Sequence, residues 1–177
     1  MKIKKTKFKG LLIIKQKDNK DNRGSLRETF NKKILKKKFV FEYCTTSKKN
    51  VLRGFHFQTK FKQSKYVNVV KGRILDVVID LRRTSKTFGK FFKIILSKQN
   101  SLGLYIPAGF AHAYYSYNEE NIIYYKLDNY YSPKFESGII YNDPTLAIKW
   151  PKKKMKVSKK DKKLLTIKEF KKKFKGL

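Results

Sequence analysis

Short runs of β-branched and aromatic residues recur about every ten residues through the middle of the chain, a spacing typical of short antiparallel strands. Turn signals such as KG, SKTFG, KQNS and NEEN separate the runs. This pattern predicts an all-β sandwich or barrel, and not alternating strands and helices. The expected strands lie within 39–47, 51–58, 64–70, 72–82, 89–97, 101–109, 111–117 and 121–131.

The pattern before residue 39 is less regular. Residues 8–15 (FKGLLIIK) predict an opening strand, and the next nine residues, KDNKDNRGS, are rich in turn formers. Segment 26–39 (LRETFNKKILKKKF) places its apolar residues near one face of a helix, which predicts a short amphipathic helix. These apolar residues are Phe30, Ile34, Leu35 and Phe39.

The C-terminal part changes to a helical period. Leu164, Ile167, Phe170 and Phe174 are spaced by three or four residues, with lysines between them. Such a helix could lie on a membrane surface or pack on the barrel with its lysines in water. The narrow apolar stripe favours packing. We therefore expect one domain over 1–177, with a core of about 8–151 and a helical segment at 158–175.

Composition indicates a folded cytoplasmic protein. The 177 residues are 40% hydrophobic, with 14 Phe and 11 Tyr, enough for one buried core. No apolar run approaches the roughly 18 residues of a membrane helix, and LLII near the start is too short for a signal peptide. The single cysteine, Cys44, has no partner for an internal disulfide.

The formal net charge of +32 raises the possibility of nucleic-acid binding. However, the positive residues are spread along nearly the whole chain, and lysines far outnumber the arginines that bidentate phosphate recognition favours. A positive field serves an anionic small ligand such as a sugar nucleotide equally well. Nucleic acid is therefore not the expected partner.

Two histidines are too few for the metal sites that β-barrels often hold, since these use three or more His or carboxylate ligands. We expect no metal and no other cofactor. A histidine without a ligand role can act as a general base. In an ideal strand His56 shares a face with Gly54 and Gln58, whereas Arg53 points to the other face.

His112 follows IPAGFA, where Pro107 and Gly109 mark a turn that would bring it near the mouth of a barrel. Asp76 and Asp80 lie on one face of an apolar strand, and a buried carboxylate needs a partner, so a hydrogen bond to a histidine is expected. Spacing alone leaves open whether either histidine is catalytic or a hydrogen-bonded core residue. The tyrosines of IIYYKLDNYY are by default packing residues.

Five motifs, in order, resemble the dTDP-4-dehydrorhamnose 3,5-epimerase family. The resemblance runs from about residue 8 to residue 165. The motifs are DNRGSLRETF (21–30), SKKNVLRGFHFQ (47–58), VVKGRILDVVIDLRRTSKTFGK (69–90), YIPAGFAHAYY (105–115) and YKLDNYYSPKFESGIIYNDPTLAIKWP (125–151).

This resemblance implies a metal-free cupin-type jelly roll, usually a homodimer, which inverts C3 and C5 of a nucleotide-linked 4-keto-6-deoxy sugar for surface polysaccharide synthesis. A proton beside the C4 ketone is acidic enough for a histidine to remove when the enolate is stabilised. A weak acid on the other face of the ring then returns a proton.

The resemblance also implies residue roles. His56 is the base, Asp161 its dyad partner and Tyr125 the proton donor. Lys65 lies near the developing enolate. The residues implied to bind substrate are Arg23, Glu28, Arg53, Gln58, His112, Glu136 and Lys160, with Phe41 and Tyr43 at ligand-contacting positions. For Arg53 to join His56, the strand needs a bulge or twist near Gly54, unless Arg53 serves a neighbouring site.

Two departures bear on the substrate. Phe41, Glu42 and Tyr43 occupy positions where the family usually has QDN, and the loop from His56 to Lys65 is one residue shorter than usual. The nucleotide and sugar could therefore differ, as in relatives that act on GDP-linked 4-keto-6-deoxyheptoses. A C3-only epimerase and a non-catalytic cupin-fold binding module, for a sugar nucleotide or a nucleic acid, are the alternatives.

Overall fold

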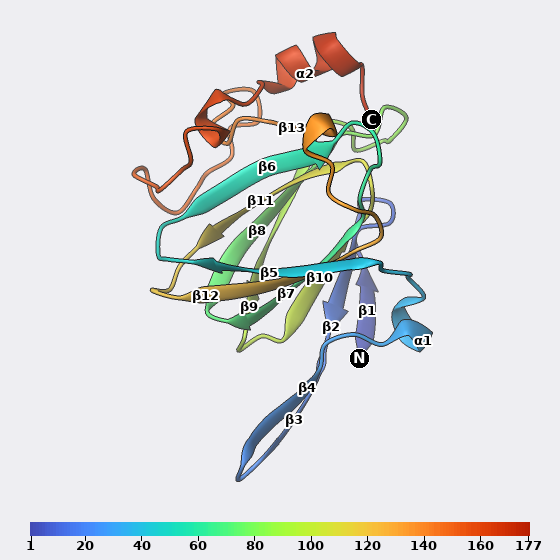
Figure 1. Cartoon of the computed structure of the whole chain (residues 1–177), viewed down its shortest axis with the longest axis vertical. Helices are drawn as coiled ribbons and strands as arrows, with labels where there is room; N and C mark the ends of the chain where they lie inside the picture. Colours follow the sequence, from blue (N-terminus) through green and yellow to red (C-terminus); the bar gives the residue numbers. More distant parts are fainter.

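Two antiparallel sheets face each other and form the body of the protein (Figure 1). The computed structural model describes residues 1–177. One sheet has six strands in the order β1-β2-β10-β7-β12-β5, and the other has five in the order β13-β6-β11-β8-β9. This sandwich confirms the predicted all-β, jelly-roll class, with two short α-helices added.

The strands of the six-stranded sheet are β1 (Lys2–Lys5), β2 (Leu12–Lys15), β10 (Leu102–Ile106), β7 (Lys65–Lys71), β12 (Asn121–Leu127) and β5 (Phe41–Ser47). Those of the five-stranded sheet are β13 (Glu136–Gly138), β6 (Leu52–Gln58), β11 (Phe110–Ser116), β8 (Arg73–Asp80) and β9 (Phe91–Ser97). Eight of these strands coincide with the eight stretches predicted from the sequence, although β7 and β11 each extend one residue beyond theirs.

The five-stranded sheet is buried on both faces, which is why its strands are apolar with little alternation. Along β8, Ile74 and Val78 face the space between the sheets, and Leu75, Val77 and Ile79 face the opposite side. The C-terminal segment covers that opposite side. Asp76 lies on the inward face, so its carboxylate points into the sandwich.

The region before residue 40 differs from the prediction. A two-stranded hairpin, β3 (Lys17–Asp21) and β4 (Gly24–Glu28), projects from the body (Figure 1). The helix predicted over 26–39 is wrong except for one turn, α1 (Lys32–Leu35). Pairing with β3 holds the first residues of that segment in β4, and the left-handed conformation of Lys36 ends α1. Strand β2 is likewise shorter than the predicted 8–15.

The C-terminal segment contains a 3-10 turn, η2 (Asp161–Lys163), and a helix, α2 (Ile167–Phe174). Another 3-10 turn, η1 (Pro133–Phe135), precedes β13. A capping box of Thr166 and Glu169 begins α2. Phe170 of α2 packs edge-on against Phe57 of β6 at 5.4 Å between ring centroids, which confirms the predicted packing on the barrel. No helix is long and apolar enough to cross a membrane.

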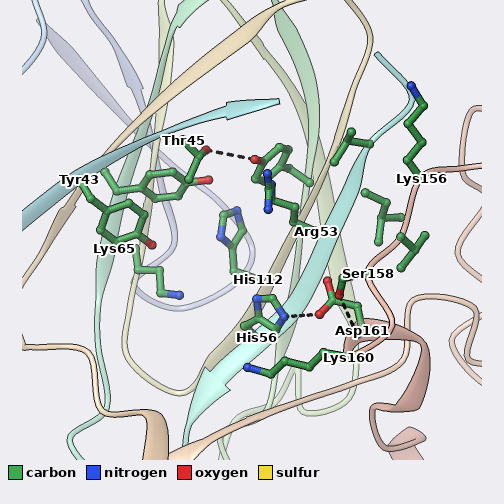
Figure 2. Close-up of a pocket in the computed structure, with 15 residues that line it drawn as sticks. Tyr43, Thr45, Arg53, His56, Lys65, His112, Lys156, Ser158, Lys160 and Asp161 are labelled. Carbon is green, nitrogen blue, oxygen red and sulfur yellow. Dashed lines mark hydrogen bonds and ion pairs between the residues drawn. The ribbon is translucent and has the colours of Figure 1, made fainter. Parts of the chain in front are cut away.

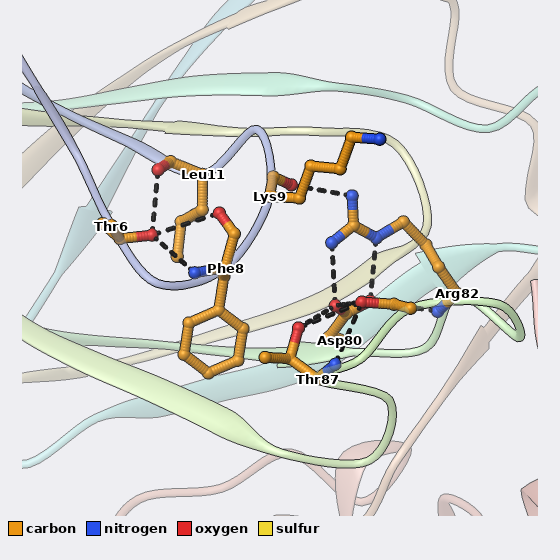
Figure 3. Close-up of polar contacts among 8 residues, drawn as sticks. Thr6, Phe8, Lys9, Leu11, Asp80, Arg82 and Thr87 are labelled. Atoms are coloured by element: carbon orange, nitrogen blue, oxygen red, sulfur yellow. Dashed lines mark hydrogen bonds and ion pairs between the residues drawn. The ribbon is translucent and has the colours of Figure 1, made fainter.

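Asp80 ties the N-terminal loop to the loop after β8 (Figure 3). Its carboxylate accepts hydrogen bonds from Arg82, Ser85 and Thr87, and Arg82 also donates to the backbone carbonyl of Lys9 at 2.8 Å. The expectation that Asp80 would pair with a histidine is therefore wrong. Arg82 lies two residues away and already neutralises the buried charge.

Candidate active site

A bulge in β6 brings Arg53 and His56 to one cavity. Between His56 and Arg53 the strand has one residue more than its partner, because His112 pairs with His56 and Tyr114 with Arg53. Gly54 permits this, since its φ is +112° and an added Cβ would lie 2.4 Å from the carbonyl oxygen of His112. Both side chains therefore line a cavity of about 560 Å³, although an ideal strand would separate them.

His56 forms a hydrogen-bonded dyad with Asp161, the partner that the resemblance implies. The Nε2 atom of His56 lies 2.9 Å from Oδ1 of Asp161 (Figure 2). Because a carboxylate only accepts, neutral His56 carries its proton on Nε2, and Nδ1 keeps a free lone pair. The His56 side chain is 30% exposed and that of Asp161 is 5% exposed, so the base meets the cavity while its partner is buried.

Backbone pairing on both sides of η2 positions Asp161. Lys156 forms a parallel bridge with Val51 just before β6, and Leu165 forms one with Ile139 just after β13. The other carboxylate oxygen of Asp161 accepts the Gly54 backbone N–H at 3.1 Å. Burial raises the pKa of Asp161, but hydrogen bonds from His56, Gly54 and Ser158 outweigh it, and the net effect lowers this pKa. Asp161 is therefore an anion that can stabilise an imidazolium.

Tyr125 enters the cavity from the facing sheet. It lies on β12, is 3% exposed, and stacks on Tyr43 of β5 with 4.7 Å between ring centroids. Burial, followed by the neighbouring Tyr114, Tyr43 and Asp76, raises the pKa of Tyr125 well above its usual value. A phenol kept neutral in this way is a proton donor.

Lys65 lies at the start of β7 and lines the same cavity. Burial lowers the pKa of its ammonium group to about 8, partly opposed by Glu136 and Asp76. Neither a hydrogen bond nor an ion pair within the chain occupies this group. Its charge is thus available to an anion that forms between His56 and Tyr125.

His112 forms a second histidine–carboxylate pair. Its Nε2 atom lies 2.8 Å from Oδ2 of Asp76, which confirms the expected hydrogen bond between a buried carboxylate of β8 and a histidine. The His112 ring also contacts Tyr125, with 6.2 Å between ring centroids. His112 is 6% exposed, so only a small part of its side chain reaches the cavity.

A second cavity of about 280 Å³ adjoins the first and shares Tyr43, His56 and Lys65 with it. Its lining includes three more of the predicted residues, Phe41, Gln58 and Glu136. Glu136 forms an ion pair with Lys160, which lines the first cavity. Predicted site residues from six strands and the C-terminal segment thus meet at one place.

Two predicted residues lie elsewhere. Arg23 and Glu28 belong to the projecting hairpin and line neither cavity. Arg23 is paired with Asp21, and its side chain is 85% exposed. Glu28 accepts a hydrogen bond from Asn31.

The sequence reasoning missed four polar residues of the larger cavity. These are Thr45, Tyr114, Lys156 and Ser158. Thr45 and Tyr114 follow from the inward alternation of β5 and β11 once the sheets are known, but no local motif marks them. No three of the His, Cys, Asp and Glu side chains gather as metal ligands would.

Comparison with known proteins gives one consistent family. Residues 5–169 match the family model described as dTDP-4-dehydrorhamnose 3,5-epimerase. The chain is 40% identical over 152 residues to the enzyme of that name from Methanothermobacter thermautotrophicus, covering 83% of this chain and 82% of the relative. It is 36% identical over 177 residues to that of Escherichia coli K12, covering 96% of each.

The fold agrees as well. A crystal structure of dTDP-6-deoxy-D-glucose-3,5-epimerase from Legionella pneumophila, in complex with dTDP-4-keto-L-rhamnose, superposes with a TM-score of 0.90 at 37% identity, covering 94% of this chain and 93% of the other. The strands of the sandwich and the family motifs occupy the same part of the sequence. The protein therefore belongs to the dTDP-4-dehydrorhamnose 3,5-epimerase family of isomerases.

Proposed function

We propose that this protein inverts C3 and C5 of a dTDP-linked 4-keto-6-deoxy sugar without a cofactor. The observation that supports this most directly is the meeting of a His56–Asp161 dyad, a neutral Tyr125 phenol and the Lys65 ammonium group around one cavity. His56 and Tyr125 come from facing sheets, so the base and the acid approach a bound ring from opposite sides. Inversion at carbon needs this arrangement.

The first step is removal of a proton beside the ketone. Nδ1 of His56 takes the proton from C3 or C5. The C–H electron pair forms a C=C bond to C4, and the C4 ketone becomes an enolate with the negative charge on its oxygen. Asp161 stabilises the imidazolium through Nε2–H. Lys65 places a positive charge by the enolate oxygen, where a water-poor site makes the interaction stronger.

The second step is the return of a proton to the other face of the ring. The O–H bond of Tyr125 breaks, a C–H bond forms opposite His56, and the ketone is restored. The phenolate then regains a proton from water, and the imidazolium loses one. Two rounds invert two carbons, and the atoms and charges balance in each round.

Arg53, Lys160 and Lys156 surround the cavity opening with positive charge. An anionic diphosphate fits this environment, and Arg53 has the fork geometry that suits phosphate oxygens. In this proposal Gln58, Glu136, Phe41 and Tyr43 contact the substrate from the smaller cavity, and His112 contacts it by the small part of its side chain that reaches the larger one.

We propose further that the protein works as a homodimer. Arg23 and Glu28 are at predicted ligand positions, yet their hairpin extends away from the body that holds the cavity (Figure 1). A partner's hairpin would bring the same two residues to this chain's cavity. Mixing His56→Ala with Arg23→Ala chains tests this, because the mixed dimer alone would contain one intact site and recover activity. A mixture as inactive as its components contradicts shared sites.

The decisive experiment follows solvent deuterium into dTDP-4-keto-6-deoxyglucose. Label at both C3 and C5 with inversion is the expected result. Label at C3 alone reduces the function to a C3 epimerase, and absence of exchange with dTDP- and GDP-linked hexoses and heptoses contradicts catalysis and favours a binding module. We also propose that the reaction takes place in the cytoplasm and supplies the synthesis of surface polysaccharide. Recovery of the protein in a cell fraction other than the cytoplasm contradicts this location.

A further inference from the structure

Three hydroxyl groups extend from Arg53 toward Tyr125, the proposed proton donor. Arg53 Nε donates to Ser47 Oγ at 3.1 Å, and Ser47 Oγ lies 2.8 Å from the hydroxyl oxygen of Tyr114. The Tyr114 hydroxyl in turn lies 3.1 Å from Thr45 Oγ1, a contact drawn in Figure 2. None of these three residues is among the predicted site residues.

Thr45 brings this chain of hydroxyls to Tyr125. On neighbouring strands, Tyr125 pairs with Tyr43 and Ile123 pairs with Thr45, so Thr45 and Tyr125 are diagonal neighbours on one face. Burial and neighbouring charge raise the pKa of Tyr125, whereas the Thr45 side chain acts to lower it. A group that lowers this pKa favours the phenolate.

The direction of each hydrogen bond follows from what each group can do. Arg53 has no acceptor, so it must donate to Ser47. Ser47 is 2% exposed and its hydroxyl has no other acceptor in the chain, so its own proton goes to Tyr114. By the same reasoning Tyr114 donates to Thr45. Thr45 lines the cavity beside Tyr125, so its own proton is free to point toward the Tyr125 oxygen.

We propose that Ser47, Tyr114 and Thr45 form a one-way chain of donors, anchored on Arg53, that aims the Tyr125 proton into the cavity and stabilises the phenolate left after proton transfer. With the Thr45 proton directed at the Tyr125 oxygen, the O–H of Tyr125 points into the cavity. Tyr114 and Thr45 are positioning residues, because they act through Tyr125. The inference rests on the proposed function and adds to it a device for the second step.

The test separates proton removal from proton return. His56 alone can exchange a substrate proton with solvent and put it back on the same face, whereas inversion needs Tyr125. The ratio of inversion to deuterium exchange therefore measures how well Tyr125 returns a proton. A general loss of folding or affinity lowers both rates and leaves this ratio unchanged. It is measured by NMR of the sugar product in deuterium oxide.

Thr45→Val removes the donor to the phenolate, and we expect this ratio to fall about tenfold or more, the usual effect of a hydrogen bond to a charged group. Tyr114→Phe leaves Thr45 in place without its orienting partner, so we expect a smaller fall of about threefold to tenfold. Thr45→Ser keeps the hydroxyl and should restore the parent ratio. The double variant Thr45→Val, Tyr114→Phe should equal Thr45→Val alone, because both break one chain.

Tyr115→Phe is the matched control. Tyr115 is the next residue of β11, is 1% exposed, and its hydroxyl donates to Asn50, outside the cavity. It should keep the parent ratio. An unchanged ratio in both Thr45→Val and Tyr114→Phe overturns the inference, as does an equal fall in Tyr115→Phe. If the parent protein exchanges no substrate proton, the proposed function fails instead, and the two failures are thereby distinguished.

Discussion

The two histidine–carboxylate pairs have the same chemistry and nearly the same length, but different surroundings. His56 Nε2 lies 2.9 Å from Asp161, and His112 Nε2 lies 2.8 Å from Asp76. His56 is 30% exposed at the cavity, whereas His112 is 6% exposed and Asp76 is fully buried. A base must exchange its proton with solvent as well as reach the ligand, and the more exposed His56 suits this role better than His112.

The two pairs are also assembled differently. Asp76 and His112 are diagonal neighbours on the adjacent strands β8 and β11, so the register of one sheet forms that pair. Asp161 comes from a C-terminal turn that docks beside β6. One oxygen of Asp76, Oδ1, has no hydrogen-bond partner in the chain, whereas both oxygens of Asp161 have one. The His56–Asp161 pair is therefore suited to proton transfer, and the His112–Asp76 pair is suited to holding the cavity wall in place.

The largest expected effect separates the two histidines. His56→Ala should lower deuterium exchange by about 10²–10⁴-fold, because it removes the general base, while dTDP binding stays within about tenfold. His112→Gln keeps a donor for Asp76 and should lower exchange by about tenfold at most. Exchange by NMR and binding by calorimetry check both. Near-normal exchange in His56→Ala would refute its role as the base.

The carboxylates should follow the same order with smaller effects. Asp161→Asn keeps the shape but cannot stabilise the imidazolium, so we expect kcat to fall on the order of 10²-fold with little change in KM. Asp76→Asn should change kcat by about tenfold at most and act mainly on stability, measured as a lower midpoint of urea unfolding. A larger fall in kcat for Asp76→Asn than for Asp161→Asn would show that His112 is the reacting histidine.

Lys65 lines the same cavity as both histidines and gives a pH dependence. Burial lowers its pKa to about 8, so its positive charge is present below that pH and is lost above it. We expect kcat/KM to fall as pH rises through about 8, by up to about tenfold per pH unit. Lys65→Arg keeps its charge and should remove this alkaline fall. If kcat/KM of Lys65→Arg falls over the same pH range, another group causes the alkaline fall.

The smallest effect concerns stability in acid. The folded-state pKa of Asp161 is lowered, so its contribution to stability is present above the unfolded pKa and is lost as pH falls through the folded one. The unfolding free energy of the parent should therefore decline more steeply below about pH 4 than that of Asp161→Asn. Parallel curves from urea titrations at several pH values would contradict this.

The strands were predictable because their apolar runs are short and separated by turn residues. The helix expected over 26–39 was not found beyond one turn, because a 3.6-residue period there competes with hairpin pairing, which involves residues outside the window. Its apolar residues nevertheless pack: Leu35 is 3% exposed against the outer face of the six-stranded sheet. A short stretch of sequence shows which apolar residues will be buried, but not which secondary-structure element will carry them.

The site was predictable in part. The scarcity of histidine and the family motifs pointed to His56, and its partner was named only through the resemblance, since 105 residues separate it from Asp161. Strand alternation placed Arg53 and His56 on opposite faces, and the bulge at Gly54 overrides this. The donor chain from Ser47 to Thr45 needed three-dimensional contacts between β5 and β11, which no spacing along the chain encodes.

The docking of η2 makes the dyad depend on a turn that lies outside both sheets. His56, Lys65, Tyr125 and His112 are held by strands, whereas Asp161 lies in a turn flanked by two isolated backbone bridges. Local opening of this turn would leave the barrel and its acid in place and remove the support of the base. Activity would therefore be lost before the sandwich unfolds.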